Sequence, residues 1–219
     1  MNAEQNRSIA PGTGTIRPAP TINLPNKLTL SRVMMVPVFV AVLSFNHVAA
    51  YIAAFIIFTL ATITDYYDGK IARERNLITN FGKLFDPVAD KVLMAAAFVM
   101  LMKLPELHVP GWTIVAILAR EFLVTGARTI AASEGSVIAA SRVGKIKTIL
   151  QMTFIFAFLF LATASFPIHA WWPESAASYL WYLALSSYVG SVFIAAFTVY
   201  SGLHFVRDNW KSLKLDQLS

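Results

Sequence analysis

Residues 65–90 read DYYDGKIARERNLITNFGKLFDPVAD and hold two pairs of aspartates. Asp65 and Asp68 are three residues apart at the end of one apolar run, and Asp86 and Asp90 are four apart at the start of the next. On helices, both spacings place the two carboxylates of a pair on one face. Two helices joined by a short polar loop can bring all four carboxylates together. Such a group is costly at a membrane boundary unless cations neutralise it.

The chemistry of this stretch points to a metal and a phosphorylated substrate. Carboxylate oxygens are hard ligands that suit Mg²⁺, Mn²⁺ or Ca²⁺. Gly69 and Ala72 are small and allow a ligand to approach the backbone, and Arg73 can hold phosphate oxygens bidentately. Two metal ions could neutralise a diphosphate, and one carboxylate could take a proton from an attacking hydroxyl. The spacing alone does not say which aspartate does so.

The composition is that of a membrane protein. Of 219 residues, 57% are apolar and 14% are charged, and the mean hydropathy is +0.60. A soluble domain carries about 25% charged residues. Cysteine is absent, which excludes disulfides, thiolate metal sites and a cysteine nucleophile.

Six apolar runs, each near the roughly 20 residues that span a bilayer, predict an all-α membrane protein with six transmembrane helices and both termini on one side. We expect a flexible N-terminal tail (1–22), a six-helix catalytic domain (23–206) and a polar C-terminal tail (207–219). The runs cover residues 28–45, 49–72, 86–104, 112–132, 146–166 and 179–205. The main connections are expected at 73–83, 105–111, 141–147 and 167–175, the last with Trp171 and Trp172 as interfacial anchors.

The basic residues orient this arrangement. Every lysine and arginine except Lys103, Arg120 and Arg128 falls on the side that holds both termini and the aspartates. The excess of basic loops predicts that this side is cytoplasmic. It also explains the net charge of +6 by membrane orientation and anionic-lipid contact, so no nucleic-acid partner is expected.

The aspartate motif resembles the signature of a known family. The pattern D-x2-D-G-x2-A-R-x8-G-x3-D-x3-D matches, at every fixed position, that of the CDP-alcohol phosphotransferases. The resemblance implies a six-helix membrane enzyme, usually a homodimer, which transfers a phosphatidyl-type group from a CDP-linked donor to an alcohol and releases CMP. It implies that Asp65, Asp68, Asp86 and Asp90 hold two metal ions, Mg²⁺ or Mn²⁺, and that Asp90 is the general base. The same resemblance implies donor contacts from Gly69, Arg73, Thr79 and Gly82.

Further stretches resemble the bacterial phosphatidylglycerophosphate synthases within that family. They read LPNKLTLSR (24–32), KLFDPVADK (83–91), REFLVTG (120–126) and GKIKT (144–148). The resemblance implies a bacterial inner-membrane enzyme with CDP-diacylglycerol as donor and sn-glycerol 3-phosphate as acceptor. It adds Asn26 and Thr29 to the donor-binding residues.

A charged acceptor also agrees with the placement of the basic residues. Arg120 lies near the middle of a helix, where an isolated cation is unfavourable. Four further cations approach the same cytoplasmic face, and together the five predict a pocket for the acceptor phosphate. The predicted acceptor residues are Arg120, Arg128, Arg142, Lys145 and Lys147.

Several alternatives stay open at this stage. Arg120 could pair with Glu121 as a structural bridge, and Lys145 and Lys147 could serve only to orient the chain. Another family member, such as a phosphatidylinositol, phosphatidylserine or cardiolipin synthase, is the nearest enzymatic rival. A cation transporter could use the aspartates as its ion path. A polyprenyl-diphosphate transferase also uses aspartates and Mg²⁺, but its motifs recur in two separate loops and only one such region is present.

Overall fold

The computed structural model describes residues 24–74, 80–133, 135–136, 138–139 and 141–210, and all regular structure in these ranges is α-helical. The helices follow the apolar runs of the sequence in order. They are α1 (Leu24–Leu43), α2 (Val48–Glu74), α3 (Asn80–Lys103), α4 (Gly111–Ser133), α5 (Arg142–Trp171) and α6 (Pro173–Asp208).

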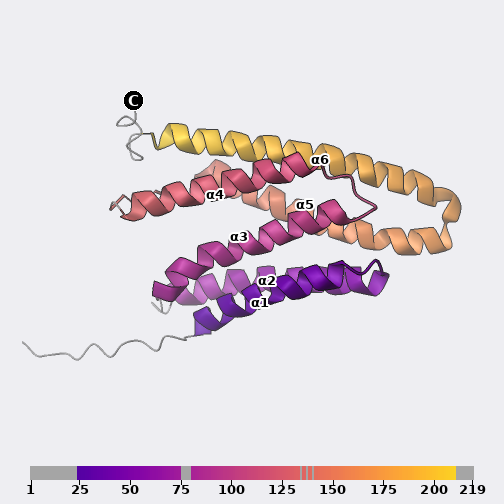
Figure 1. The fold of residues 1–219 in the computed structure, drawn as a ribbon, viewed down its shortest axis with the longest axis horizontal. Helices are drawn as coiled ribbons and strands as arrows, with labels where there is room; N and C mark the ends of the chain where they lie inside the picture. Colours follow the sequence, from indigo (N-terminus) through magenta and orange to yellow (C-terminus); the bar gives the residue numbers. More distant parts are fainter. Residues whose placement is uncertain (1–23, 75–79, 134, 137, 140, 211–219) are drawn as a thin grey trace, which may run out of the picture.

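The six helices form two groups of three that pack along one another (Figure 1). In one group α1 packs against α2 and α3, and in the other α6 packs against α4 and α5. Contacts of α2 with α5, and of α3 with α4 and α5, join the two groups. The helices alternate in direction, so that α1, α3 and α5 begin, and α2, α4 and α6 end, at the left end in Figure 1. The last turns of α2 and the first turns of α3, which carry the aspartate motif, therefore lie at this same end.

Three of the predicted connections are shorter than expected. The expected connection at 73–83 is reduced at both ends, since α2 continues to Glu74 and α3 begins at Asn80. The expected basic connection at 141–147 is the start of α5, where the Ser141 side chain caps the helix by accepting a hydrogen bond from the Gly144 N–H (3.1 Å). The expected turn at 167–175 shrinks to Trp172, because α5 continues through Pro167. A proline removes only one backbone hydrogen bond, whereas ending the helix inside an apolar segment would leave several backbone groups unpaired.

Glycine ends α4 as helix-stop chemistry predicts. Gly135 has a φ of 83°, in the left-handed region that a side chain disfavours. Its N–H donates to the Ala132 carbonyl (3.1 Å), and the Ser136 N–H donates to the Ala131 carbonyl (2.8 Å). These two bonds form a Schellman motif, which satisfies carbonyls that would otherwise lack partners.

The core lies between the helices and contains aromatic rings in contact. Phe58 of α2 is fully buried, with its ring centroid 5.9 Å from that of Phe39 and 5.0 Å from that of Phe156. These contacts join α1, α2 and α5. Hydroxyl groups inside the helices are satisfied locally, as where Thr59 Oγ1 donates to the Phe55 carbonyl (2.7 Å). Such back-bonding lets polar residues stay in an apolar surrounding.

Three helices are long and apolar enough to cross a membrane within the described residues. They are residues Val48–Asp65 of α2, the whole of α5 and the whole of α6. The apolar part of α1, Leu30–Leu43, is shorter. Large apolar side chains such as Val115 (67% exposed), Leu123 (72%) and Leu203 (67%) face outward. An outer surface of this kind suits lipid rather than water, and the chain is a membrane protein.

We predict that Phe58→Ala lowers the free energy of unfolding by about 3–5 kcal/mol, because it leaves a cavity among three helices. Phe160→Ala is the matched control, since the Phe160 side chain is 62% exposed. Thermal unfolding of both variants in detergent checks this. Equal losses for the two variants would contradict the assignment of the core.

Candidate active site

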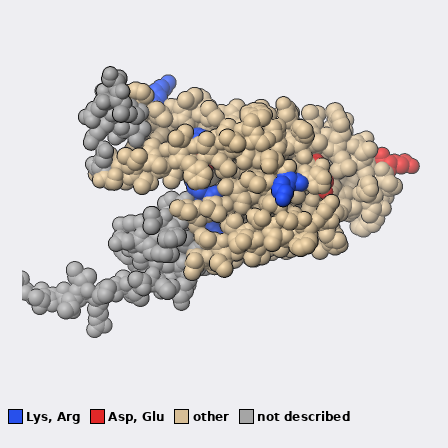
Figure 2. All heavy atoms as spheres, viewed as in Figure 1, with Lys and Arg blue, Asp and Glu red and all other residues tan. Residues whose placement is uncertain are grey.

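A cavity of about 330 Å³ gathers basic side chains from α3, α4 and α5. Its charged lining consists of Lys91, Arg120, Glu121, Arg128, Lys145 and Lys147. Four of the five predicted acceptor residues are therefore brought together. The fifth, Arg142, is exposed in the first turn of α5 and does not line this cavity. Figure 2 shows several lysine and arginine side chains where the two helix groups meet, on a face that is otherwise nearly uncharged.

The Glu121 carboxylate lies among these cations and is 5% exposed. Its Oε2 is 3.1 Å from Lys91 Nζ, and its Oε1 accepts a hydrogen bond from Lys147 Nζ. Arg120 Nη1 lies 3.4 Å from the same Oε1. The suggested bridge between Arg120 and Glu121 is thus present, but Glu121 also pairs with cations from α3 and α5. We call Glu121 and the three cations Lys91, Arg120 and Lys147 the Glu121 cluster.

Side chains of α6 contact the Glu121 cluster and the residues next to it. Arg120, which is 8% exposed, donates through Nη2 to Ser201 Oγ (2.9 Å). Gln151 Nε2 donates to Thr198 Oγ1 (3.1 Å) and reaches Glu121 Oε1 at 3.5 Å. The Arg128 guanidinium lies over the Phe205 ring, 5.1 Å from its centroid, in a cation–π contact.

Sequence reasoning missed Lys91, Gln151 and the α6 residues as parts of the site. Lys91 directly follows Asp90, and this position beside the aspartate motif could have identified Lys91 as a site residue. No local signal pointed to Ser201, which is 81 residues from Arg120.

The aspartate motif lies on the two helices that the spacing predicted. Asp65 and Asp68 are in α2, and Asp86 and Asp90 are in α3. Asp65 alone among the four has a described side chain, which is 39% exposed and forms an ion pair with the buried Arg32 of α1 at 2.5 Å.

The other three aspartate side chains lie outside the description, as do the side chains of Asn26, Thr29 and Arg73. Thr79 also lies outside the described residues, whereas Gly69 and Gly82 are helical positions of α2 and α3.

Lys91 connects the aspartate motif with the cavity of about 330 Å³, which we call the cation cavity because lysine and arginine side chains line it. It directly follows Asp90 on α3, and its Nζ contacts Glu121 in the cavity lining. The backbone of α3 next to Asp90 therefore lies within the length of one lysine side chain of Glu121. This adjacency brings a motif suited to metal and diphosphate next to a group of cations suited to a second anion.

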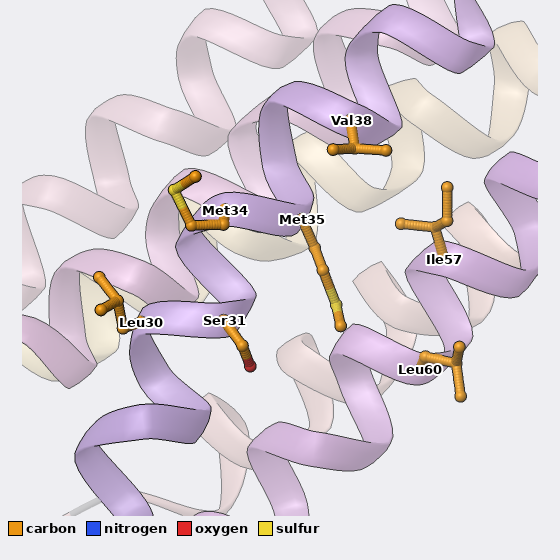
Figure 3. Close-up of a pocket in the computed structure, with 7 residues that line it drawn as sticks. All are labelled: Leu30, Ser31, Met34, Met35, Val38, Ile57 and Leu60. Atoms are coloured by element: carbon orange, nitrogen blue, oxygen red, sulfur yellow. The ribbon is translucent and has the colours of Figure 1, made fainter.

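An apolar groove of about 560 Å³ runs between α1 and α2 close to the Arg32–Asp65 pair. It is lined by α1 from Leu30 to Val38 and by Ile57 and Leu60 of α2. Figure 3 shows the Met35 side chain reaching from α1 toward α2 across this groove. Ser31 supplies the hydroxyl group in a lining that is otherwise apolar. The groove is therefore suited to a hydrocarbon chain.

We predict that Glu121→Gln lowers the free energy of unfolding by about 3–5 kcal/mol, because it leaves three clustered cations without their shared counter-ion. Glu106→Gln is the control, since Glu106 is half-buried and its partner in the described part of the chain is neutral, the Tyr51 hydroxyl (3.2 Å). Unfolding in detergent measures both, and the double variant Glu121→Gln/Lys147→Met should recover part of the loss. A loss no larger than that of Glu106→Gln would mean that the Glu121 cluster adds no net stability.

The chain was compared with known proteins. A family model for the CDP-alcohol phosphatidyltransferases matches residues 22–187. A Bacillus subtilis protein named CDP-diacylglycerol–glycerol-3-phosphate 3-phosphatidyltransferase is 37% identical over 208 residues, which cover 88% of this chain and 97% of that protein. A Rickettsia felis protein of the same name is 45% identical over 130 residues, covering 59% and 71% of the two chains. A Mycobacterium tuberculosis protein named probable phosphatidylglycerophosphate synthase is 43% identical over 166 residues, covering 74% and 77%. The family match covers most of the chain and agrees with the aspartate motif on α2 and α3, so this protein belongs to the CDP-alcohol phosphatidyltransferase family.

Proposed function

We propose that the protein transfers the phosphatidyl group of CDP-diacylglycerol to sn-glycerol 3-phosphate, forming phosphatidylglycerophosphate and CMP. The names of the relatives from three bacterial genera support this choice within the family. The observation that carries it is the cation cavity next to the aspartate motif. Among the residues that the structure describes, five cations line that cavity against one carboxylate, Glu121. This excess of positive charge suits a phosphate monoester, which carries close to two negative charges at neutral pH. An uncharged acceptor such as inositol would not need it.

The donor set of the aspartate motif fits divalent metal ions. Four carboxylates on two successive helices supply hard oxygen ligands, and one of them, Asp65, already forms an ion pair with a cation, Arg32. Under this proposal Asp65, Asp68, Asp86 and Asp90 hold two Mg²⁺ or Mn²⁺ ions. When bound, these ions would neutralise the diphosphate of the donor and the charge of the departing CMP.

Under this proposal each step of the reaction involves particular residues of the chain. Asp90 accepts the proton of the acceptor 1-hydroxyl, whose oxygen attacks the phosphorus nearest the lipid. The bond between that phosphorus and the bridging oxygen breaks, and CMP leaves with the electron pair. Arg73 holds the departing phosphate, and the remaining donor contacts come from Asn26, Thr29, Gly69, Thr79 and Gly82. The cavity residues Arg120, Arg128, Lys145 and Lys147 hold the acceptor phosphate, and the exposed Arg142 attracts it to the cavity mouth.

The membrane placement follows from the same charges. All six helices cross the inner membrane, and Lys91 of α3 and Arg120, Glu121 and Arg128 of α4 line the cavity inside the bundle. The aspartate end and both termini face the cytoplasm, because basic residues gather there. Acyl chains of the donor lie in the surrounding lipid and along the groove between α1 and α2. Residues 1–22 and 207–219 act as tails of the membrane domain, and the protein works as a homodimer.

The decisive experiment is release of CMP from CDP-diacylglycerol by the purified protein in detergent. We expect release only with glycerol 3-phosphate, its loss with EDTA, and its recovery with Mg²⁺ or Mn²⁺. Inositol and serine, offered in parallel, should give none. Turnover with either of them but not with glycerol 3-phosphate would overturn the acceptor assignment, and ion flux into liposomes without CMP release would indicate a transporter.

We predict that Asp90→Asn lowers kcat at least 10³-fold, because an amide cannot accept the proton of the hydroxyl. The unfolding midpoint should stay close to that of the unchanged protein. Asp208→Asn is the control, since Asp208 lies at the end of α6 and pairs with His204 at 2.7 Å. Near-normal turnover by Asp90→Asn would remove this residue from the base role.

A further inference from the structure

Beyond residue 187, where the family match ends, one face of α6 packs against Arg120 and Arg128, two residues that line the cavity. Thr198, Ser201, Gly202 and Phe205 follow the spacing i, i+3, i+4, i+7, which places them on one side of the helix. All four are buried. We call these four residues the α6 face.

Each residue of the α6 face contacts the site. Ser201 Oγ accepts a hydrogen bond from Arg120 Nη2 at 2.9 Å. A Cβ atom at Gly202 would lie 2.8 Å from Arg120 Cγ, so the arginine stem passes where only glycine leaves room. Phe205 lies under the Arg128 guanidinium, and Thr198 holds Gln151, which reaches Glu121.

These contacts fix the Arg120 side chain at both ends of its guanidinium. Nη1 faces Glu121 at 3.4 Å and Nη2 faces Ser201, while the stem lies against Gly202. The Nε atoms of Arg120 and Arg128 are buried and have no hydrogen-bond partner within the described part of the chain. An unpaired buried donor is costly, so a partner that is absent here would be bound favourably. Both residues line the cavity, so an anion bound there would lie beside their guanidinium groups.

We propose that the α6 face is a positioning surface that holds Arg120 and Arg128 in place for the phosphate of the acceptor. This inference rests on the proposed function and deepens it, because it assigns acceptor affinity to a helix that carries no part of the aspartate motif. An arginine held in advance loses less side-chain entropy on binding. Changes in the α6 face therefore alter binding of the acceptor and leave binding of the CDP-linked donor unchanged.

The chain offers matched control variants on the same helix. Gly190 is as tightly packed as Gly202, since a Cβ there would lie 2.9 Å from Phe154 Cε2, but Phe154 belongs to the apolar core and not to the cavity lining. Ser191 is as buried as Ser201, at 1% exposed, and donates to the Tyr188 carbonyl of its own helix. The pairs Ser201→Ala with Ser191→Ala, and Gly202→Ala with Gly190→Ala, separate the site from helix packing in general.

Steady-state kinetics with each substrate varied in turn test the proposal. We expect Ser201→Ala and Gly202→Ala to raise the KM for glycerol 3-phosphate about tenfold, the size of one lost hydrogen bond to a charged group. The KM for CDP-diacylglycerol and kcat at saturating acceptor should stay within about twofold of their original values. The two control variants should leave both KM values unchanged, with unfolding midpoints that match those of their partners.

The outcomes distinguish this inference from the proposed function. If the unchanged protein does not turn over glycerol 3-phosphate, the proposed function fails, and the acceptor named here fails with it. If the unchanged protein is active but the α6-face variants behave like their controls, only the positioning role is overturned. An equal rise of both KM values overturns it too, since that shows a general loss of structure. Should Gly202→Ala unfold more readily than Gly190→Ala, Ser201→Ala decides, because it removes a single oxygen atom.

Discussion

The arrangement of the site depends on one carboxylate that contacts three cations from three helices, two of which are buried. Lys91, Arg120 and Lys147 would repel one another in an apolar bundle, and desolvation would penalise each of them. Glu121 contacts all three and also accepts a hydrogen bond from Gln151, while Ser201 accepts one from Arg120. These contacts hold α3, α4, α5 and α6 together at the site.

Among the described residues, the single carboxylate of Glu121 does not neutralise all five cations that line the cavity. Arg128 and Lys145 line the same cavity without a contact to Glu121, so positive charge remains unopposed among the described residues. Under the proposed function the cavity binds an anion and the aspartate motif on α2 and α3 binds metal cations. A transferase that joins a phosphate-bearing alcohol to a metal-bound diphosphate needs both kinds of site next to each other. The contact of Lys91 with Glu121, one residue after Asp90, keeps them close.

The helices were largely predictable from the sequence, and the errors in their predicted boundaries have identifiable causes. Apolar runs located all six helices, because a run of this length in a membrane must satisfy its own backbone hydrogen bonds. The predicted boundaries were wrong where charge or proline was taken to end a helix. Residues 142–147 are basic yet helical, since Ser141 caps α5 and the cavity gives Lys147 a partner. Pro167 lies inside α5 because the apolar segment continues past it.

The sequence by itself determined the aspartate motif, the helices that carry it, the family, and a set of basic residues on one side. These features rest on local spacing, and positions three or four apart share a face of any helix. Only the tertiary structure decided which cations surround Glu121 and which face of α6 supports them. Lys147 lies 26 residues from Glu121, and Ser201 lies 81 from Arg120. Contacts at such separations depend on how whole helices pack and rotate against each other, and no local pattern in the chain encodes that.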